Sequence, residues 1–180
     1  MQRIDSQSVQ ISKTGEATRQ FHLPIGKRSG RLMALLGESG KLSIQYDAMN
    51  RIGRATIGPT TTKFEYSGEG KLTGVLQTHD QTTPQRLCSY RYDEAGNLTG
   101  AVDGRGGKWR YTYHADNRIN AIVDPTGYGF YHTYDPWGRV THTWGDDGLY
   151  DLTLDYSPIE RKTTVRFADG VVKRYHYDNS

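Results

Sequence analysis

The chain has 180 residues, a length that fits one domain or a piece of a larger protein. Its 34% hydrophobic content, 21 glycines and 13 tyrosines favour many short strands joined by many turns. The net charge of +3 comes from dispersed lysines and arginines, which argues against a nucleic-acid-binding protein. Cys88 is the sole cysteine, so an intrachain disulfide and a multi-cysteine zinc site are both excluded. We see neither a signal peptide nor the run of about 18 apolar residues that a membrane span needs.

The first 40 residues are the least regular part of the chain. Residues 9–21 predict a hairpin about Thr14 and Gly15. The segment from Gly30 to Gly40 is predicted to be a degenerate copy of the repeat that follows. Gly26 lies 20 residues before Tyr46, which is close to the spacing of the later copies. Since no linker or change of composition follows, we expect one continuous domain, with a hairpin and a degenerate repeat in residues 1–40 and regular repeats in residues 41–180.

From residue 41 onward the chain repeats one unit, seen clearly in YDEAGNL at residues 92–98 and YDPWGRV at residues 134–140. The tyrosines that open successive copies are separated by 20, 26, 21, 21, 22 and 21 residues. This spacing predicts a repeat protein with six copies and the start of a seventh. The opening tyrosines are Tyr46, Tyr66, Tyr92, Tyr113, Tyr134, Tyr156 and Tyr177.

Each tyrosine is followed by the residues of a tight turn. Asp, Ser or His comes next and can accept backbone N–H bonds across the turn. The fifth position holds a residue that tolerates a left-handed backbone: Asn50, Gly70, Gly96, Asn117 or Gly138. The pattern predicts a type I turn closed by a left-handed residue, which makes a hairpin with a small bulge. Glu160 breaks the rule, so we expect that turn to be built differently.

Apolar and polar residues alternate before each tyrosine, as in a half-buried antiparallel strand. A second turn cluster lies midway through each unit, so one unit is strand, turn, strand, turn in about 21 residues. The 26-residue interval between Tyr66 and Tyr92 is longer than the others. Its additional residues lie in the polar segment 78–86, which predicts an extended loop between two strands. The fold class is therefore all-β, an array of antiparallel hairpins forming a strongly twisted sheet.

The recurring aspartates Asp47, Asp93, Asp135 and Asp178 could form a ladder of calcium sites. We interpret them as turn caps, because serine or histidine replaces aspartate in other copies. Glycines flank Asp146 and Asp147, which indicates an exposed turn rather than a general acid and base.

The histidines and the cysteine read as structural residues. His132 falls on the predicted apolar face, and His142 alternates in phase with Val140 and Trp144, which predicts the same face for it. No two histidines have a ligand spacing tied to a third group. Cys88 is expected to be a small buried residue. We therefore predict no catalytic residue, no metal site and no cofactor.

Aromatic residues alternate with Lys or Arg in residues 108–113 and 173–177. Such rows could bind carbohydrate or single-stranded nucleic acid. Cross-strand packing is the interpretation we favour, because a repeat array needs such rows to hold its units together. Solvent exposure distinguishes these two interpretations. Binding would be favoured if one surface exposed all four of these side chains: Trp109, Tyr111, Trp137 and Trp144.

The unit Tyr-Asp-x-x-Gly-Arg-(Leu/Val/Ile), repeated about every 21 residues over residues 40–180, resembles the RHS/YD-repeat family. Members include bacterial polymorphic toxins, C components of insecticidal toxin complexes, wall-associated proteins and teneurins. Beyond the seven tyrosines, the signature residues that carry the resemblance are Asp93, Gly96, Asp135, Gly138 and Arg139. In that family the hairpins join into one long sheet that spirals into a hollow shell, which in the bacterial toxins encloses a C-terminal toxic domain.

The resemblance implies a non-catalytic sector of a β-shell that encapsulates a toxin for delivery to competing cells or hosts. Its implied partners are the rest of its own shell and the C-terminal toxin cargo. The family's self-cleavage motif, Asp-Pro-x-Gly-Leu, is not matched, since Tyr128 stands where Leu belongs in the nearest segment, residues 124–129. The implied location is the cytoplasm before export and then delivery by a bacterial secretion system.

Two further expectations complete the sequence analysis. A sector of a shell has exposed edge strands, so we expect self-association or pairing with a partner by strand addition. The alternative function is a binding module for glycans or a cell-surface partner that uses the aromatic rows.

Overall fold

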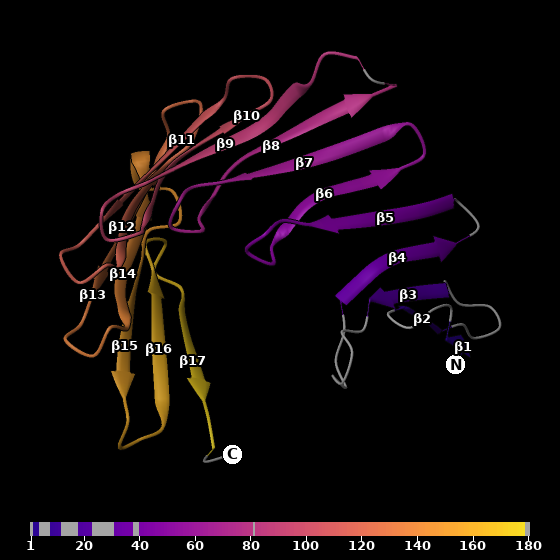
Figure 1. The fold of residues 1–180 in the computed structure, drawn as a ribbon. Helices are drawn as coiled ribbons and strands as arrows, with labels where there is room; N and C mark the ends of the chain where they lie inside the picture. The colour runs from indigo at the N-terminus through magenta and orange to yellow at the C-terminus, as the bar shows by residue number, and fades with distance from the viewer. Residues whose placement is uncertain are drawn as a thin grey trace. The chain divides into compact units, whose positions relative to one another are not determined.

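A computed structural model describes residues 2–3, 8–11, 18–22, 31–37, 40–80 and 82–178. Apart from one short 3₁₀ turn, Asp146–Gly148, the regular elements in these ranges are all β-strands, which confirms the predicted all-β class. No helix in the described ranges is long and apolar enough to cross a membrane. Each strand pairs antiparallel with its neighbour in the chain (Figure 1).

The chain forms two compact units, Met1–Ser89 and Tyr90–Ser180, and each is a run of hairpins. The first unit contains β1 (Gln2–Arg3), β2 (Ser8–Ile11), β3 (Thr18–His22), β4 (Arg31–Gly37), β5 (Gly40–Tyr46), β6 (Ile52–Ile57), β7 (Thr60–Tyr66), β8 (Leu72–His79) and the first part of β9 (Gln85–Tyr92). The second unit contains the end of β9, then β10 (Leu98–Asp103), β11 (Lys108–Tyr113), β12 (Ile119–Val123), β13 (Gly129–Tyr134), β14 (Val140–Gly145), β15 (Leu152–Ser157), β16 (Lys162–Phe167) and β17 (Val172–His176).

The turn after each signature tyrosine has the predicted geometry. The Asp93 N–H donates to the Asn97 carbonyl at 3.0 Å, and the Gly96 N–H donates back to the Asp93 carbonyl at 3.0 Å. Gly96 has a φ of 85°, in the left-handed region that glycine adopts without strain. The same position is left-handed in the other regular copies, at Asn50, Gly70, Asn117 and Gly138.

The turn at Glu160 is built differently, as predicted. There the left-handed residue is Arg161, with a φ of 49°, and its N–H donates to the Pro158 carbonyl at 3.2 Å. Strands β15 and β16 pair in continuous register up to Ser157 and Lys162, so this hairpin has no bulge next to its turn.

Strand alternation gives each unit a tyrosine face and a polar face. In β7, Phe64 and Tyr66 point to the tyrosine face, while Thr61, Lys63 and Glu65 point to the opposite, polar face. In β13, Tyr134 shares the tyrosine face with Phe130 and His132. Among the described residues only Ala34, Ile44 and Val165 are buried apolar side chains. Within each unit, the hairpins therefore form a thin sheet rather than a conventional two-layer core.

Two strands of the N-terminal segment pair with each other. β2 pairs antiparallel with β3, with Val9 opposite Phe21, as the predicted hairpin requires. Thr14 and Gly15, the expected turn, lie outside the described residues, as do Gly26 and Gly30.

The predicted loop over residues 78–86 is wrong in its bounds, because both strands extend into it. Thr78 and His79 end β8, opposite Thr61 and Thr60, and β9 already begins at Gln85. The polar side chains are accommodated in the sheet because they have partners there: Thr60 Oγ1 and His79 Nδ1 lie 3.0 Å apart.

Candidate functional site: contacts between successive repeats

The hydroxyl of a signature tyrosine donates a hydrogen bond to the main chain of the preceding repeat. The Tyr134 hydroxyl donates to the Ile119 carbonyl at 2.6 Å, and Ile119 is the aliphatic residue that follows the preceding signature turn. Four more tyrosines make the equivalent bond: Tyr46 to Leu32 at 3.0 Å, Tyr66 to Ile52 at 2.9 Å, Tyr113 to Leu98 at 2.8 Å and Tyr156 to Val140 at 2.8 Å. The tyrosine that opens one repeat is thus attached to the repeat before it.

An arginine from the preceding turn lies over the ring of the same tyrosine. The Arg51 guanidinium carbon is 4.3 Å from the Tyr66 ring centroid, and that of Arg139 is 4.4 Å from the Tyr156 centroid. Arg31 and Arg118 lie over Tyr46 and Tyr134 at 5.4 and 5.0 Å. These are cation–π distances, so ring and guanidinium attract each other as well as pack.

The aspartate after the tyrosine holds this arginine in place. Asp135 Oδ1 accepts the N–H groups of Trp137 at 3.0 Å and Arg139 at 2.9 Å, and Oδ2 accepts Arg139 Nε at 2.7 Å. Burial acts to raise the pKa of Asp135, but the Arg139 backbone N–H and guanidinium outweigh it and hold that pKa below its usual value. Asp47 contacts Met49 and Arg51 in the same way. The backbone N–H of Arg51 is the main cause of the lowered pKa of Asp47.

We call this arrangement the inter-repeat contact: the turn aspartate orients an arginine, the arginine covers the next tyrosine, and that tyrosine bonds back to the main chain. The left-handed glycine of the next turn lies beside the arginine, where its φ and not a lack of space favours glycine. A Cβ on Gly138 would lie 3.4 Å from Arg118 Nη1, and one on Gly70 would lie 3.5 Å from Arg51 Nη1. The signature residues thus form one repeating structural contact rather than a row of separate sites.

A family model named RHS Repeat matches residues 66–108 and 92–128, a region that holds three of these turns. This match supports the resemblance of the chain to the RHS/YD-repeat family. Solved structures share the fold of this chain. The crystal structure of TcdB2-TccC3-Cdc42 superposes with a TM-score of 0.64 and 15% identity, over 91% of this chain and 11% of that chain. TcdB2-TccC3 without the hypervariable C-terminal region gives a TM-score of 0.62 and 16% identity, over 83% of this chain and 9% of that one.

One curated protein with a similar sequence is a toxin. Double-stranded DNA deaminase toxin A of Burkholderia cenocepacia is 23% identical over 155 residues, which covers 77% of this chain and 11% of that protein. This chain therefore spans about a tenth of the length of the relatives that it matches.

RHS copies that lack one signature residue keep the contact by substitution. Where His114 replaces aspartate, Asp116 accepts the Arg118 Nε at 2.7 Å and also pairs with its Nη2. Arg118 then donates from Nη1 to the Asp135 carbonyl at 2.9 Å. Where Asn97 replaces arginine, its Nδ2 donates to Asp93 Oδ2 at 3.1 Å and to Asn117 Oδ1, in the next turn, at 2.8 Å.

The two remaining signature tyrosines mark the ends of the second unit. Tyr92 is half-buried at the end of β9. Tyr177 follows β17, is 52% exposed, and donates its N–H to the Arg161 carbonyl at 3.1 Å. The sequence pattern identified all seven tyrosines but assigned no partner to the arginines. The signal that could have found one is the pairing of each signature arginine with the next tyrosine along the chain.

The prediction that His142 shares the face of Val140 is wrong. Tyr134 pairs with Val140 but Thr133 pairs with His142, so Thr141 is an extra residue that reverses the alternation. His142 lies instead on the polar face, stacked on Trp144 at 4.4 Å, and Trp144 stacks on Tyr131 at 5.4 Å. His132 lies on the tyrosine face, where burial lowers its pKa.

Two other expectations also need correction. Asp146 is half-buried rather than exposed, because it accepts the Gly129 N–H at 2.7 Å and the Tyr131 hydroxyl at 3.1 Å; only its neighbour Asp147 is exposed. Cys88 is half-buried rather than buried. In the part of the chain that is described, no three His, Cys, Asp or Glu side chains are grouped as a metal site would require.

Solvent exposure differs among the four aromatic residues whose exposure distinguishes a binding role from a packing role. Trp137 is 78% exposed at its turn and Trp109 is 37% exposed, whereas Tyr111 and Trp144 are half-buried. Trp144 is engaged in the stack with Tyr131 and His142, and Trp109 and Trp144 point to opposite faces of the second unit. They do not form a single open aromatic surface.

Proposed function

We propose that this chain is a non-catalytic structural segment of an RHS-repeat shell that encapsulates a C-terminal toxin for delivery to competing cells or hosts. The inter-repeat contact is the observation that carries the proposal. It recurs from Tyr46 to Tyr156, and it uses the tyrosine, aspartate and arginine side chains to join hairpins. The polar groups of these side chains bind neighbouring residues of the sheet, which is the role expected of structural residues.

The relatives support the toxin part of the proposal. The curated relative is named as a toxin, and the solved structures include TcdB2-TccC3 without its hypervariable C-terminal region. A shell segment made in the cytoplasm and then exported by a bacterial secretion system fits these relatives. Its partners would be the rest of its shell and the enclosed polypeptide.

The thin sheet supports a role within a larger assembly. β17 pairs with β16, and the strand is exposed along its whole length, including Val172 and Tyr175. An exposed edge strand is a template for pairing with another strand. We propose that β17 accepts the next strand of the shell, or a second copy of this chain when that strand is missing.

Limited proteolysis of the full-length protein that carries this segment tests encapsulation. We expect its C-terminal toxin region to resist protease in the native protein and to become sensitive when the inter-repeat contacts are broken by combined Tyr134→Ala and Tyr156→Ala substitutions. A toxin region that is digested equally fast in the native protein and in the variant would contradict encapsulation.

A second candidate function is a glycan-binding module, and the 78% exposure of Trp137 favours it. Indole rings on a surface stack well against sugar rings. A glycan array with the native chain and with Trp137→Ala tests this function. Binding that disappears in the variant would support it, and no binding by either protein would contradict it.

A further inference from the structure

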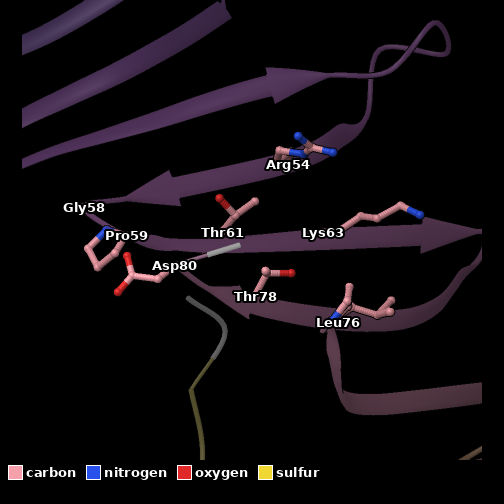
Figure 2. Close-up of a pocket in the computed structure, with 9 residues that line it drawn as sticks. Arg54, Gly58, Pro59, Thr61, Lys63, Leu76, Thr78 and Asp80 are labelled. Atoms are coloured by element: carbon pink, nitrogen blue, oxygen red, sulfur yellow. The ribbon is translucent and has the colours of Figure 1, made fainter. Parts of the chain in front are cut away.

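The polar face of the first unit carries a groove of about 610 Å³ over strands β6, β7 and β8. Figure 2 shows Arg54, Thr61 and Thr78 on three successive strands, with Pro59 and Asp80 toward one end of the groove and Lys63 and Leu76 toward the other. These side chains belong to none of the inter-repeat contacts.

The two cations of this groove face each other across the sheet. Arg54 lies directly opposite Lys63 in the pairing of β6 with β7. Like charges at such positions destabilise a sheet. The nearby carboxylate, Glu65, is shared: its Oε1 is 3.4 Å from Lys63 Nζ, and its Oε2 is 2.9 Å from Arg86 Nη2. Among the described residues, no carboxylate forms an ion pair with Arg54.

The second unit has a smaller groove of the same character, with a volume of about 190 Å³. Arg91, Lys108 and Arg110 line it, and no acidic residue does. Arg110 lies opposite Gly100, which has no side chain to cover it. Within the described ranges none of these three cations has an ion-pair partner. Uncompensated cations therefore occur on the polar face of each unit independently.

We propose that the polar face binds acidic polypeptide segments, with glutamate or aspartate carboxylates entering between the cations of neighbouring strands. Each groove offers two or three cations beside apolar surface, from Leu76 in one and from Val102, which lies opposite Lys108, in the other. Separated carboxylates on a peptide match that layout. A continuous polyanion such as nucleic acid matches it less well, because its evenly spaced charges would also lie beside Asp80, whereas the separated carboxylates of a peptide can lie near Lys63, toward the other end of the larger groove.

This inference deepens the proposed function and rests on it only for the identity of the partner. In a shell that encloses a toxin, the acidic segment would belong to the enclosed polypeptide, and the polar face would be the face turned toward it. Charge contacts between discrete groups would hold such a cargo without requiring one fixed sequence, because exposed ion pairs are individually weak.

Fluorescence anisotropy of the full chain with a labelled peptide of alternating glutamate and glycine tests the inference at low salt. We expect binding that the matched glutamine–glycine peptide does not show and that high salt abolishes. Arg54→Gln/Lys63→Gln and Arg91→Gln/Arg110→Gln should each weaken binding about three- to tenfold. Arg54→Lys should retain binding, since it keeps the charge.

The matched control is Arg161→Gln/Lys173→Gln, which removes the same charge from an exposed turn and from the tyrosine face. Equal weakening by this control would show that net charge alone attracts the peptide, and would overturn the inference. Tighter binding of a DNA duplex than of the peptide would overturn the class of partner. Loss of peptide binding with retained protease protection in the full-length protein would separate this inference from the proposed function.

Discussion

The hydroxyl of Tyr134 donates a 2.6 Å hydrogen bond to the carbonyl of Ile119, which lies 15 residues earlier in the chain. This bond leaves one repeat and ends in another. The bond explains why each repeat opens with tyrosine. The apolar ring packs on its face of the sheet, and the hydroxyl binds the main chain of the neighbouring repeat.

Tyr134→Phe should lower the free energy of unfolding by about 1 kcal/mol, because it removes one part-buried hydrogen bond and leaves the ring in place. Urea denaturation measures the change. The matched control is Tyr111→Phe, since the described residues provide no hydrogen-bond partner for the Tyr111 hydroxyl and little change is expected. Equal losses in the two variants would argue against the inter-repeat role of the hydroxyl.

Asp135→Asn should destabilise the chain at neutral pH and have a much smaller effect in acid. The pKa of Asp135 is lower in the folded chain than in the unfolded one, so its stabilising effect is present above the unfolded value of about 3.9. That effect is lost as the pH falls through the folded pKa. Thermal melts from neutral to acidic pH, with Asp147→Asn as control, measure it. A stability difference between native and variant that stayed constant into acid would be inconsistent with this account.

Gly138→Ala should cost about 1 kcal/mol or more, because Gly138 has a φ of 84°, a left-handed backbone in which alanine is strained. Gly138→Asn should cost less, since asparagine occupies this position in other copies and tolerates a left-handed backbone. The control is Gly68→Ala, where a Cβ would meet nothing within 4 Å and φ is not positive. Similar melting temperatures for all three variants would contradict the requirement for a left-handed residue.

Arg54→Gln should stabilise the chain by a few tenths of a kcal/mol at low salt, because it removes the like-charge pair with Lys63. The gain should shrink at high salt, where charge repulsion is screened. Thermal melts at two salt concentrations measure it, with Arg161→Gln as control. Destabilisation at low salt would mean that Arg54 is a structural residue and not a charge held for a ligand.

The repeat, its turns and the all-β fold could be predicted from the sequence because they depend on local chemistry. The left-handed position at Gly96 and the different turn at Glu160 are properties of a few consecutive residues. The spacing of the tyrosines then fixes the order of the hairpins.

The predictions that were wrong concern features that are determined by pairing between neighbouring strands. The extra residue at Thr141 reverses the faces of β14, and alternation along one strand cannot reveal it, because the bulge is defined by the pairing with β13. Asp146 is half-buried because Gly129 and Tyr131, far earlier in the chain, donate to it. The contact of Arg139 with Tyr156 likewise exists only once two repeats lie side by side.

A double-mutant cycle on Arg139 and Tyr156 tests most directly whether the signature residues join one repeat to the next. The four proteins are the native chain, Arg139→Gln, Tyr156→Leu and the double variant, and the measured quantity is the free energy of unfolding. The account predicts a coupling energy of about 0.5–1 kcal/mol, with the double variant losing less than the sum of the single losses. Strictly additive losses would contradict it, because they would mean that the arginine of one repeat and the tyrosine of the next do not act together.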